Sequence, residues 1–280
     1  MKRIAVIGAG TMGHGIAQIS AVAGYETMLT DSSEAALEQA LHRIVGNLEG
    51  AVQRGKLTRE AAHTAKNHIG VDAALDDAVD GADLVIEAIV EDLDAKRGLF
   101  QRLGRLLPHA ILATNTSSLS VSRIAQAADR PERVLGMHFF NPVHIMRLVE
   151  IVPHAGTETS VVERTREVAG RMGKEPIVVQ DTPGFASSRL GVVLGLEAMR
   201  MLEQGVASPE DIDKALELGY GHPMGPLKVT DLVGLDVRLA IAEYLHQELK
   251  DAQYAPPEIL RRKVAAGELG KKTGKGFYDW

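Results

Sequence analysis

Two polar residues lie inside apolar runs where packing alone does not require them. His138 is near the end of the run 133–139, and Glu150 lies within the run 147–152, twelve residues further on. If these runs are neighbouring strands, the carboxylate comes to lie beside the imidazole, fixing one tautomer and stabilising the imidazolium. Such a pair predicts a general base that removes a hydroxyl proton while hydride leaves the same carbon for a nicotinamide.

Neighbouring polar residues could assist that chemistry. Ser117 and Asn141 could donate hydrogen bonds to the reacting oxygen or to a nearby carbonyl. The structural alternatives are a hydrogen-bonded core histidine, a structural ion pair for Glu150, and a turn or helix cap for Ser117. His144 and the remaining histidines are interpreted as structural. Because the spacing of His138 and His144 is not that of metal ligands, we predict no metal site.

The first 31 residues contain the elements needed to hold the cofactor of such a reaction. A short buried strand over 2–7 is followed by the glycine-rich segment 8–13, a helical pattern over 15–23, a strand over 25–30, and Asp31. This order is that of a dinucleotide-binding βαβ unit of the Rossmann type.

Three glycines of the segment have distinct expected roles. Gly8 permits a tight turn, Gly10 leaves room for a pyrophosphate, and Gly13 lets the helix approach the strand. The N–H groups at the start of the helix, next to Thr11 and Met12, favour phosphate.

The acidic residue after the second strand predicts which dinucleotide is bound. Asp31 follows Gly10 by 21 residues, so its carboxylate can accept hydrogen bonds from the adenine ribose. A 2′-phosphate would be repelled, and neither Ser32 nor Ser33 supplies a neutralising arginine. We therefore predict NAD rather than NADP.

Strands alternate with helices over the rest of the first half. This alternation predicts a parallel doubly wound α/β sheet, whose ligands bind beyond the carboxyl ends of the strands. Asp31, Glu91 and the segment 115–118 lie at such ends. Further strands are expected over 83–89, 110–114, 133–139, 147–152 and 176–179, and helices over 34–55, 93–107 and 158–172.

The turn residues 181–184 mark the expected domain boundary. We predict an NAD-binding domain over 1–183 and a helical substrate and dimerisation domain over 184–280. An apolar helix opening the second domain favours a homodimer, unless that face packs on its own core. Helices are expected over 185–204, 209–218, 227–250 and 257–266, with no strand.

Composition excludes several classes of protein. With 280 residues, 45% hydrophobic residues and a net charge of −6, the chain does not resemble a general nucleic-acid-binding protein. It has no cysteine, and no run approaches the roughly 18 apolar residues of a membrane span. We expect a cytoplasmic protein without membrane or nucleic-acid partners.

Taken together, the motifs resemble those of the short-chain L-3-hydroxyacyl-CoA (3-hydroxybutyryl-CoA) dehydrogenases. The resemblance spans essentially the whole chain, with the motifs in the family's order. They occur at 8–13, 87–91, 115–119, 138–142, 148–150, 181–185, 223–226 and 270–277.

This resemblance implies oxidation of (S)-3-hydroxyacyl-CoA, 3-hydroxybutyryl-CoA foremost, to 3-oxoacyl-CoA with NAD. It implies His138 as base and Glu150 as its partner, with Ser117 and Asn141 orienting the substrate. Further cofactor contacts are implied for Glu91, Lys96, Ser117 and Lys272.

The substrate-facing regions leave two points open. The helix end carrying Arg54 and Lys56 matches the family's CoA-binding region, although a solvated helix end is the alternative. Ser188 stands where the family usually has asparagine in the substrate pocket, which puts rate or substrate preference in doubt. The rival functions are a related dehydrogenase of a free hydroxy acid or sugar acid, and a non-catalytic NAD-binding protein.

Overall fold

The computed structural model describes residues 1–280, and the chain divides into two compact units. The first unit, Met1–Thr182, is an α/β domain, and the second, Pro183–Trp280, is helical. No helix in either unit combines the length and the apolar character required to cross a membrane.

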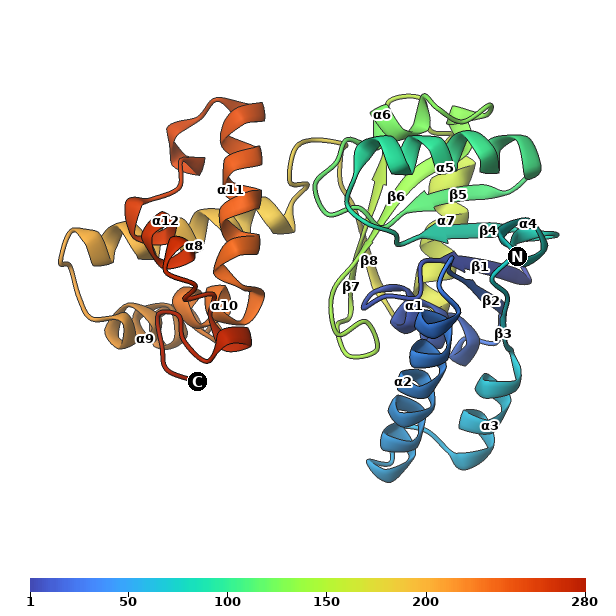
Figure 1. Cartoon of the computed structure of the whole chain (residues 1–280), viewed down its shortest axis with the longest axis horizontal. Coiled ribbons are helices and arrows are strands. Elements are labelled where there is room, and N and C mark those ends of the chain that lie inside the picture. Colours follow the sequence, from blue (N-terminus) through green and yellow to red (C-terminus); the bar gives the residue numbers. More distant parts are fainter. The chain divides into compact units, whose positions relative to one another are not determined.

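An eight-stranded sheet organises the first unit (Figure 1). Its strands are ordered β3-β2-β1-β4-β5-β6-β7-β8. From β1 the chain first adds strands on one side, as β2 and β3, and then on the other side, beginning with β4. This is the topological switch point at which doubly wound sheets bind ligands. The strands are β1 Arg3–Ile7, β2 Glu26–Thr30, β3 Ile69–Val71, β4 Leu84–Glu87, β5 Ile111–Thr114, β6 Val134–Phe139, β7 Leu148–Pro153 and β8 Glu175–Val178.

The predicted α/β fold class is confirmed, but the sheet is not wholly parallel. Strands β1 to β6 are parallel, whereas β7 pairs antiparallel with β6, and β8 is parallel to β7. The reason lies in residues 140–147, which join β6 to β7 without a helix. A parallel crossover needs a dozen or more residues, so this short connection returns the chain antiparallel.

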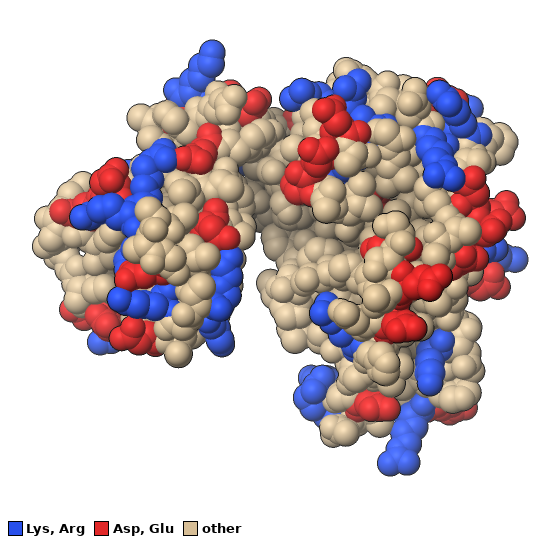
Figure 2. All heavy atoms as spheres, in the orientation of Figure 1, with Lys and Arg blue, Asp and Glu red and all other residues tan.

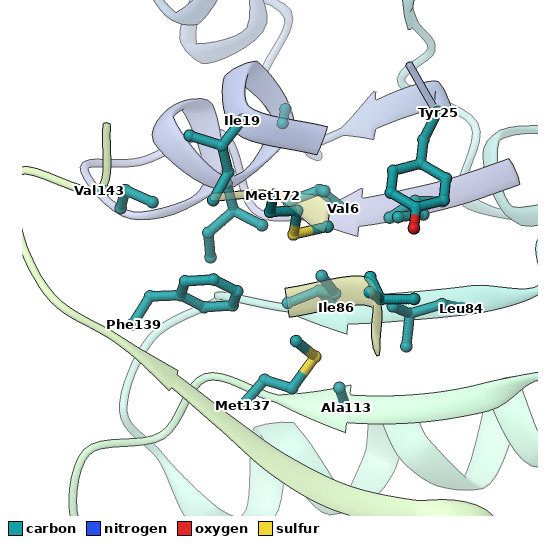
Figure 3. Close-up of a cluster of buried hydrophobic side chains, with 14 of the residues drawn as sticks. Val6, Ile19, Tyr25, Leu84, Ile86, Ala113, Met137, Phe139, Val143 and Met172 are labelled. Carbon is teal, nitrogen blue, oxygen red and sulfur yellow. The ribbon is translucent and has the colours of Figure 1, made fainter. Parts of the chain in front are cut away.

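Helices cover both faces of the sheet. One core contains alternate strand residues such as Val6, Ile86 and Met137, which lie with Ile19 and Met172 (Figure 3). The alternate residues of the same strands form the second core, against α4, α5 and α6. The helices of this unit are α1 Gly13–Val22, α2 Glu34–Gln53, α3 Arg59–Asn67, α4 Leu75–Val79, α5 Leu93–Leu106, α6 Val121–Ala125 and α7 Thr159–Arg171.

The second unit has five α-helices around one apolar core. The helix expected over 227–250 is interrupted at Gly234, whose φ of 102° is one that L side chains rarely adopt. Only isolated β-bridges, between Gly270, Lys275 and Asp279, occur in this unit. The helices are α8 Ser187–Glu203, α9 Pro209–Tyr220, α10 Pro226–Val233, α11 Leu235–Leu249 and α12 Glu258–Ala265.

A buried carboxylate fixes the C-terminal segment of this unit. Asp231 accepts hydrogen bonds from the backbone N–H groups of Phe277 and Tyr278, and from Trp280 Nε1 at 2.9 Å. A side chain at Gly276 would overlap this carboxylate, so glycine is required for the close approach. The glycine and aromatic residues near the C-terminus therefore have a structural explanation.

Candidate active site

The predicted histidine–carboxylate pair is formed. His138 Nδ1 donates a hydrogen bond to Glu150 Oε2 at 2.7 Å, with the residues 5% and 0% exposed. The two residues are also direct partners in the β6–β7 register. Because the carboxylate engages Nδ1, the proton-accepting nitrogen of the neutral ring is Nε2.

Strand alternation explains why these side chains meet. Met137 and Phe139 of β6, and Val149 and Ile151 of β7, point into the first core. His138 and Glu150 consequently project from the opposite face, where cross-strand partners have Cβ atoms about 5 Å apart. The antiparallel return of β7 is thus what brings the acid to the imidazole.

The loop after β5 is tied to neighbouring strands by polar side chains. Asn115 Oδ1 accepts a hydrogen bond from Phe139 N at 2.9 Å, linking this loop to the end of β6. Glu91 Oε1 accepts from Thr116 Oγ1 at 2.5 Å and from Ser117 N at 2.9 Å. The structure therefore brings Glu91 and Ser117 together at the carboxyl ends of β4 and β5.

Lys96 belongs to the same network but is not exposed. Its ammonium lies 2.5 Å from Glu87 Oε1 and 3.4 Å from Glu91 Oε2, and the residue is 1% exposed. Thr114 Oγ1 donates to the other oxygen of Glu87 at 2.6 Å. Lys96 thus neutralises two carboxylates at this edge, while its direct contact with a cofactor stays a prediction.

A cavity of about 740 Å³ opens at the switch point of the sheet. Gly8 and Gly10 line it after β1, and Asp31 lines it after β2. Asp31 Oδ2 accepts from Ala9 N at 2.8 Å and Oδ1 accepts from Ser33 N at 2.9 Å, which orients the carboxylate. Apolar residues and Arg102 complete the wall.

The glycine-rich turn fits a dinucleotide. Gly8 has a φ of 100°, and a Cβ there would lie 2.5 Å from the Ala88 oxygen. A Cβ at Gly10 would meet nothing within 4 Å, which leaves space for a phosphate. At Gly13 a side chain would overlap the Gly8 carbonyl, so glycine lets α1 approach β1. Thr11 and Met12 lead from this turn into α1.

Basic residues gather at the ends of α2 and α3 (Figure 2). Arg54, the C-cap of α2, and Lys56 are exposed. Burial lowers the pKa of His144, and the positive charges of His14, Arg54 and Lys174 lower it further. Since these cations repel one another, an anion at this surface would be favoured.

The remaining predicted residues lie in two places. Asn141, in the first unit, is exposed and lies two residues after the end of β6. Ser188 is the second residue of α8 in the second unit and is half-buried. In the same unit, Lys272 Nζ contacts both carboxylate oxygens of Asp236 at 2.6 Å. This bond offsets the effect of burial and lowers the pKa of Asp236.

Comparison with known proteins identifies the family. Residues 3–182 match the model of the 3-hydroxyacyl-CoA dehydrogenase NAD binding domain, and residues 184–280 match that of the C-terminal domain. The chain belongs to the 3-hydroxyacyl-CoA dehydrogenase family.

Related proteins are similar to this chain over its full length. It is 44% identical to a probable 3-hydroxybutyryl-CoA dehydrogenase of Bacillus subtilis, covering 100% of this chain and 98% of the relative. It is also 44% identical to the 3-hydroxyadipyl-CoA dehydrogenase of Escherichia coli, covering 100% of this chain and 59% of the relative. The structure of (S)-3-hydroxybutyryl-CoA dehydrogenase from Ralstonia eutropha superimposes with a TM-score of 0.96 at 38% identity, covering 100% and 99% of the two chains.

Three residues that matter to the geometry of this dehydrogenase had no predicted role. Glu87 is the buried partner of Lys96, Arg102 lines the switch-point cavity, and Asp236 holds Lys272. For Glu87, an acid ending the apolar strand 84–87 was an available signal. Arg102 and Asp236 lie in amphipathic helices, where a charged residue carries no such signal.

Proposed function

We propose that the chain oxidises (S)-3-hydroxyacyl-CoA, 3-hydroxybutyryl-CoA foremost, to 3-oxoacyl-CoA, with His138 as general base oriented by Glu150. The buried 2.7 Å bond between these residues carries the proposal, because it presents an imidazole whose Nε2 can accept a proton. The hydroxyl hydrogen leaves as a proton to Nε2. NAD, when bound, supplies the nicotinamide that accepts the hydride from the same carbon.

Other residues of the chain would bind and orient the two ligands. We assign the pyrophosphate to the glycine turn 8–13 with Thr11 and Met12, and the adenine ribose to Asp31. Glu91 and Ser117, which follow β4 and β5, and Lys96 of α5 would also contact the cofactor, and Lys272 would lie near its nicotinamide end. The oriented Asp31 carboxylate and the open space at Gly10 support NAD as the cofactor.

The substrate side of the proposal involves five residues. Ser117 and Asn141 would donate hydrogen bonds to the substrate oxygens, and Ser188 would contact the acyl portion. Arg54 and Lys56 would bind the phosphates of coenzyme A. The cluster of positive charge around Arg54 supports this assignment in a chain with a net charge of −6.

A steady-state assay tests the function. NADH oxidation would be followed with acetoacetyl-CoA, longer 3-oxoacyl-CoA esters, and matched free 3-oxo acids. We expect turnover of the CoA esters and little of the free acids. Preferential turnover of free acids would indicate the rival dehydrogenase, and NADH binding without turnover would indicate a non-catalytic protein.

We also propose that the chain forms a homodimer through the second unit. Leu190 is 66% exposed and Leu194 is partly exposed on α8, and Leu218 at the end of α9 is 83% exposed. Exposed leucines of this kind favour burial against another protein surface. Sedimentation velocity should give a dimer, and Leu190→Glu with Leu194→Glu should shift it toward monomer. A monomeric wild type would contradict this assignment.

A further inference from the structure

Residues 140–147, which join β6 to β7, have to hold a functional side chain without a helix of their own. They contain Asn141, three residues after His138, and much of their surface is exposed, as at Ile145 and Met146. A surface connection of this kind is mobile unless other parts of the chain fix it. Asn141 can therefore orient a substrate only if residues 140–147 are held from outside.

A buried lysine supplies two of the contacts that hold this connection. Lys174 lies directly before β8 and is 8% exposed, and its Nζ donates to the carbonyl oxygens of Val143 and, at 2.7 Å, of Met146. Between these carbonyls the chain makes a turn, in which the Pro142 oxygen accepts from the N–H groups of Ile145 and Met146. Lys174 thus connects the turn to the start of β8.

Packing alone does not account for a lysine at this position. Burial lowers the pKa of Lys174, and no carboxylate opposes that effect. Taking an ammonium out of water costs free energy that its hydrogen bonds must offset. Both of those bonds go to residues 140–147, so the charged end of the side chain serves this connection.

Val143 is held from the core as well. Its side chain is 2% exposed and belongs to the first core (Figure 3). It faces Gly15 of α1, where a Cβ would lie only 2.8 Å from the Val143 Cβ, so glycine permits this approach. With its side chain in the core and its carbonyl bonded to Lys174, Val143 is a fixed point of the connection.

A second fixed point lies on the other side of Asn141. Phe139 N donates to Asn115 Oδ1 at 2.9 Å, and the Phe139 side chain is buried in the same core. Only residues 140–142 separate this point from Val143, with Asn141 in the middle. So short a stretch between two fixed ends has few conformations, and releasing either end gives Asn141 more of them.

We propose that Lys174 is a positioning residue for the reaction, which fixes Asn141 relative to His138 by holding the carbonyls of Val143 and Met146. The inference rests on the proposed dehydrogenase function, in which Asn141 orients the substrate. All of these residues belong to the first unit. Lys174 takes no part itself in proton or hydride transfer.

Hydrogen exchange of the full chain tests the structural part. In wild type, peptides covering 140–147 should contain protected amides although the connection is at the surface. Lys174→Met keeps a long side chain but removes both bonds, so exchange there should become about tenfold faster, with peptides of β1 and β4 unchanged. Arg147→Met is the matched control, because it removes an exposed cation from the same connection, and should leave exchange as in wild type.

Kinetics test the effect on the reaction. With acetoacetyl-CoA and NADH, Lys174→Met should lower kcat/KM for the ester by about 10- to 100-fold, as expected when an orienting group is misplaced. The dissociation constant for NADH should stay within about threefold of wild type. Arg147→Met should match wild type in both quantities.

A double variant separates positioning from a general loss of structure. Asn141→Ala removes the group that Lys174 is proposed to position. Adding Lys174→Met to Asn141→Ala should therefore lower kcat/KM by less than about threefold further, because residues that act through one another are not additive. A full additive loss would show that Lys174 acts by another route and would overturn the inference.

Three other results are decisive. Unprotected amides at 140–147 in wild type, a result that needs no variant to fold, would overturn the inference, as would unchanged exchange or kcat/KM in Lys174→Met. Faster exchange throughout the first unit together with weaker NADH binding would indicate a general structural role and would also overturn it. Absence of wild-type turnover with every CoA ester, with protected amides at 140–147, would instead refute the dehydrogenase function on which it rests.

Discussion

Two buried cations, Lys96 in the first unit and Arg238 in the second, differ in their partners. In the first unit, Lys96 is 1% exposed and contacts Glu87, with Glu91 close by. In the second unit, Arg238 is buried to a similar extent, yet no carboxylate of the chain neutralises it. Lys96 is thus neutralised by carboxylates of its own unit, and Lys174, also buried in the first unit, donates to the carbonyl oxygens of Val143 and Met146. Arg238 differs from both, because its buried Nε has no hydrogen-bond partner.

The His138–Glu150 pair is also formed within the first unit. Glu150 is fully buried and is compensated by His138 across two strands. A buried carboxylate in that position stabilises the protonated imidazole, and without the imidazole it would be left without its hydrogen-bond partner. Removing one member of such a buried pair should therefore strongly lower turnover or the free energy of unfolding. The following substitutions test that expectation.

Glu150→Gln should give the largest effect. The amide cannot stabilise the imidazolium, so we expect kcat to fall by roughly 100-fold or more while NADH still binds. Stopped-flow and steady-state assays with acetoacetyl-CoA measure this. Glu175→Gln, which changes an exposed carboxylate on the adjacent strand β8, is the matched control and should leave kcat near wild type. Near-normal kcat in Glu150→Gln would remove the proposed base pair.

Lys96→Met should strongly destabilise the first unit. It leaves Glu87 buried without its cation, which costs about 3–5 kcal/mol. In urea unfolding, far-UV circular dichroism reports on both units, whereas fluorescence of the only tryptophan, Trp280, reports on the second. A transition seen by circular dichroism and not by fluorescence therefore belongs to the first unit. The double variant Lys96→Met, Glu87→Gln should recover much of the loss. A single variant as stable as wild type would show that this ion pair is not needed.

A surface glutamate bonded to two lysines should give the smallest effect. Hydrogen bonds from Lys263 and Lys275 lower the pKa of Glu268 to about 2. Its contribution to stability is therefore present above the usual glutamate pKa and is lost as the pH falls toward 2. Glu268→Gln should lower Tm by at most about 3 °C at pH 7 and by much less near pH 2, as measured by calorimetry. An equal loss at both values would contradict the assignment.

Much of the fold was predictable because the relevant patterns are local. The glycine turn, the apolar strands and the Ser33 and Ser208 helix caps are all visible in sequence. Short elements such as β3 and α4 have too few residues for a periodic pattern. The interruption at Gly234 was missed because a single glycine does not by itself show whether a helix continues.

The candidate site was predictable to the extent that strand pairing determines it. His138 and Glu150 could be matched because both lie in short apolar runs that pair directly. Arg238 could not be found in this way. Its burial and lack of a partner depend on Gly191 and Gly195 of another helix, a tertiary contact that spacing along the chain does not encode.

The most direct test of the central claim is His138→Gln, assayed for NADH binding and for turnover of acetoacetyl-CoA. If His138 is the general base, the dissociation constant for NADH should stay within about threefold of wild type while kcat falls by roughly 10²- to 10⁴-fold. Turnover close to that of wild type would contradict the account.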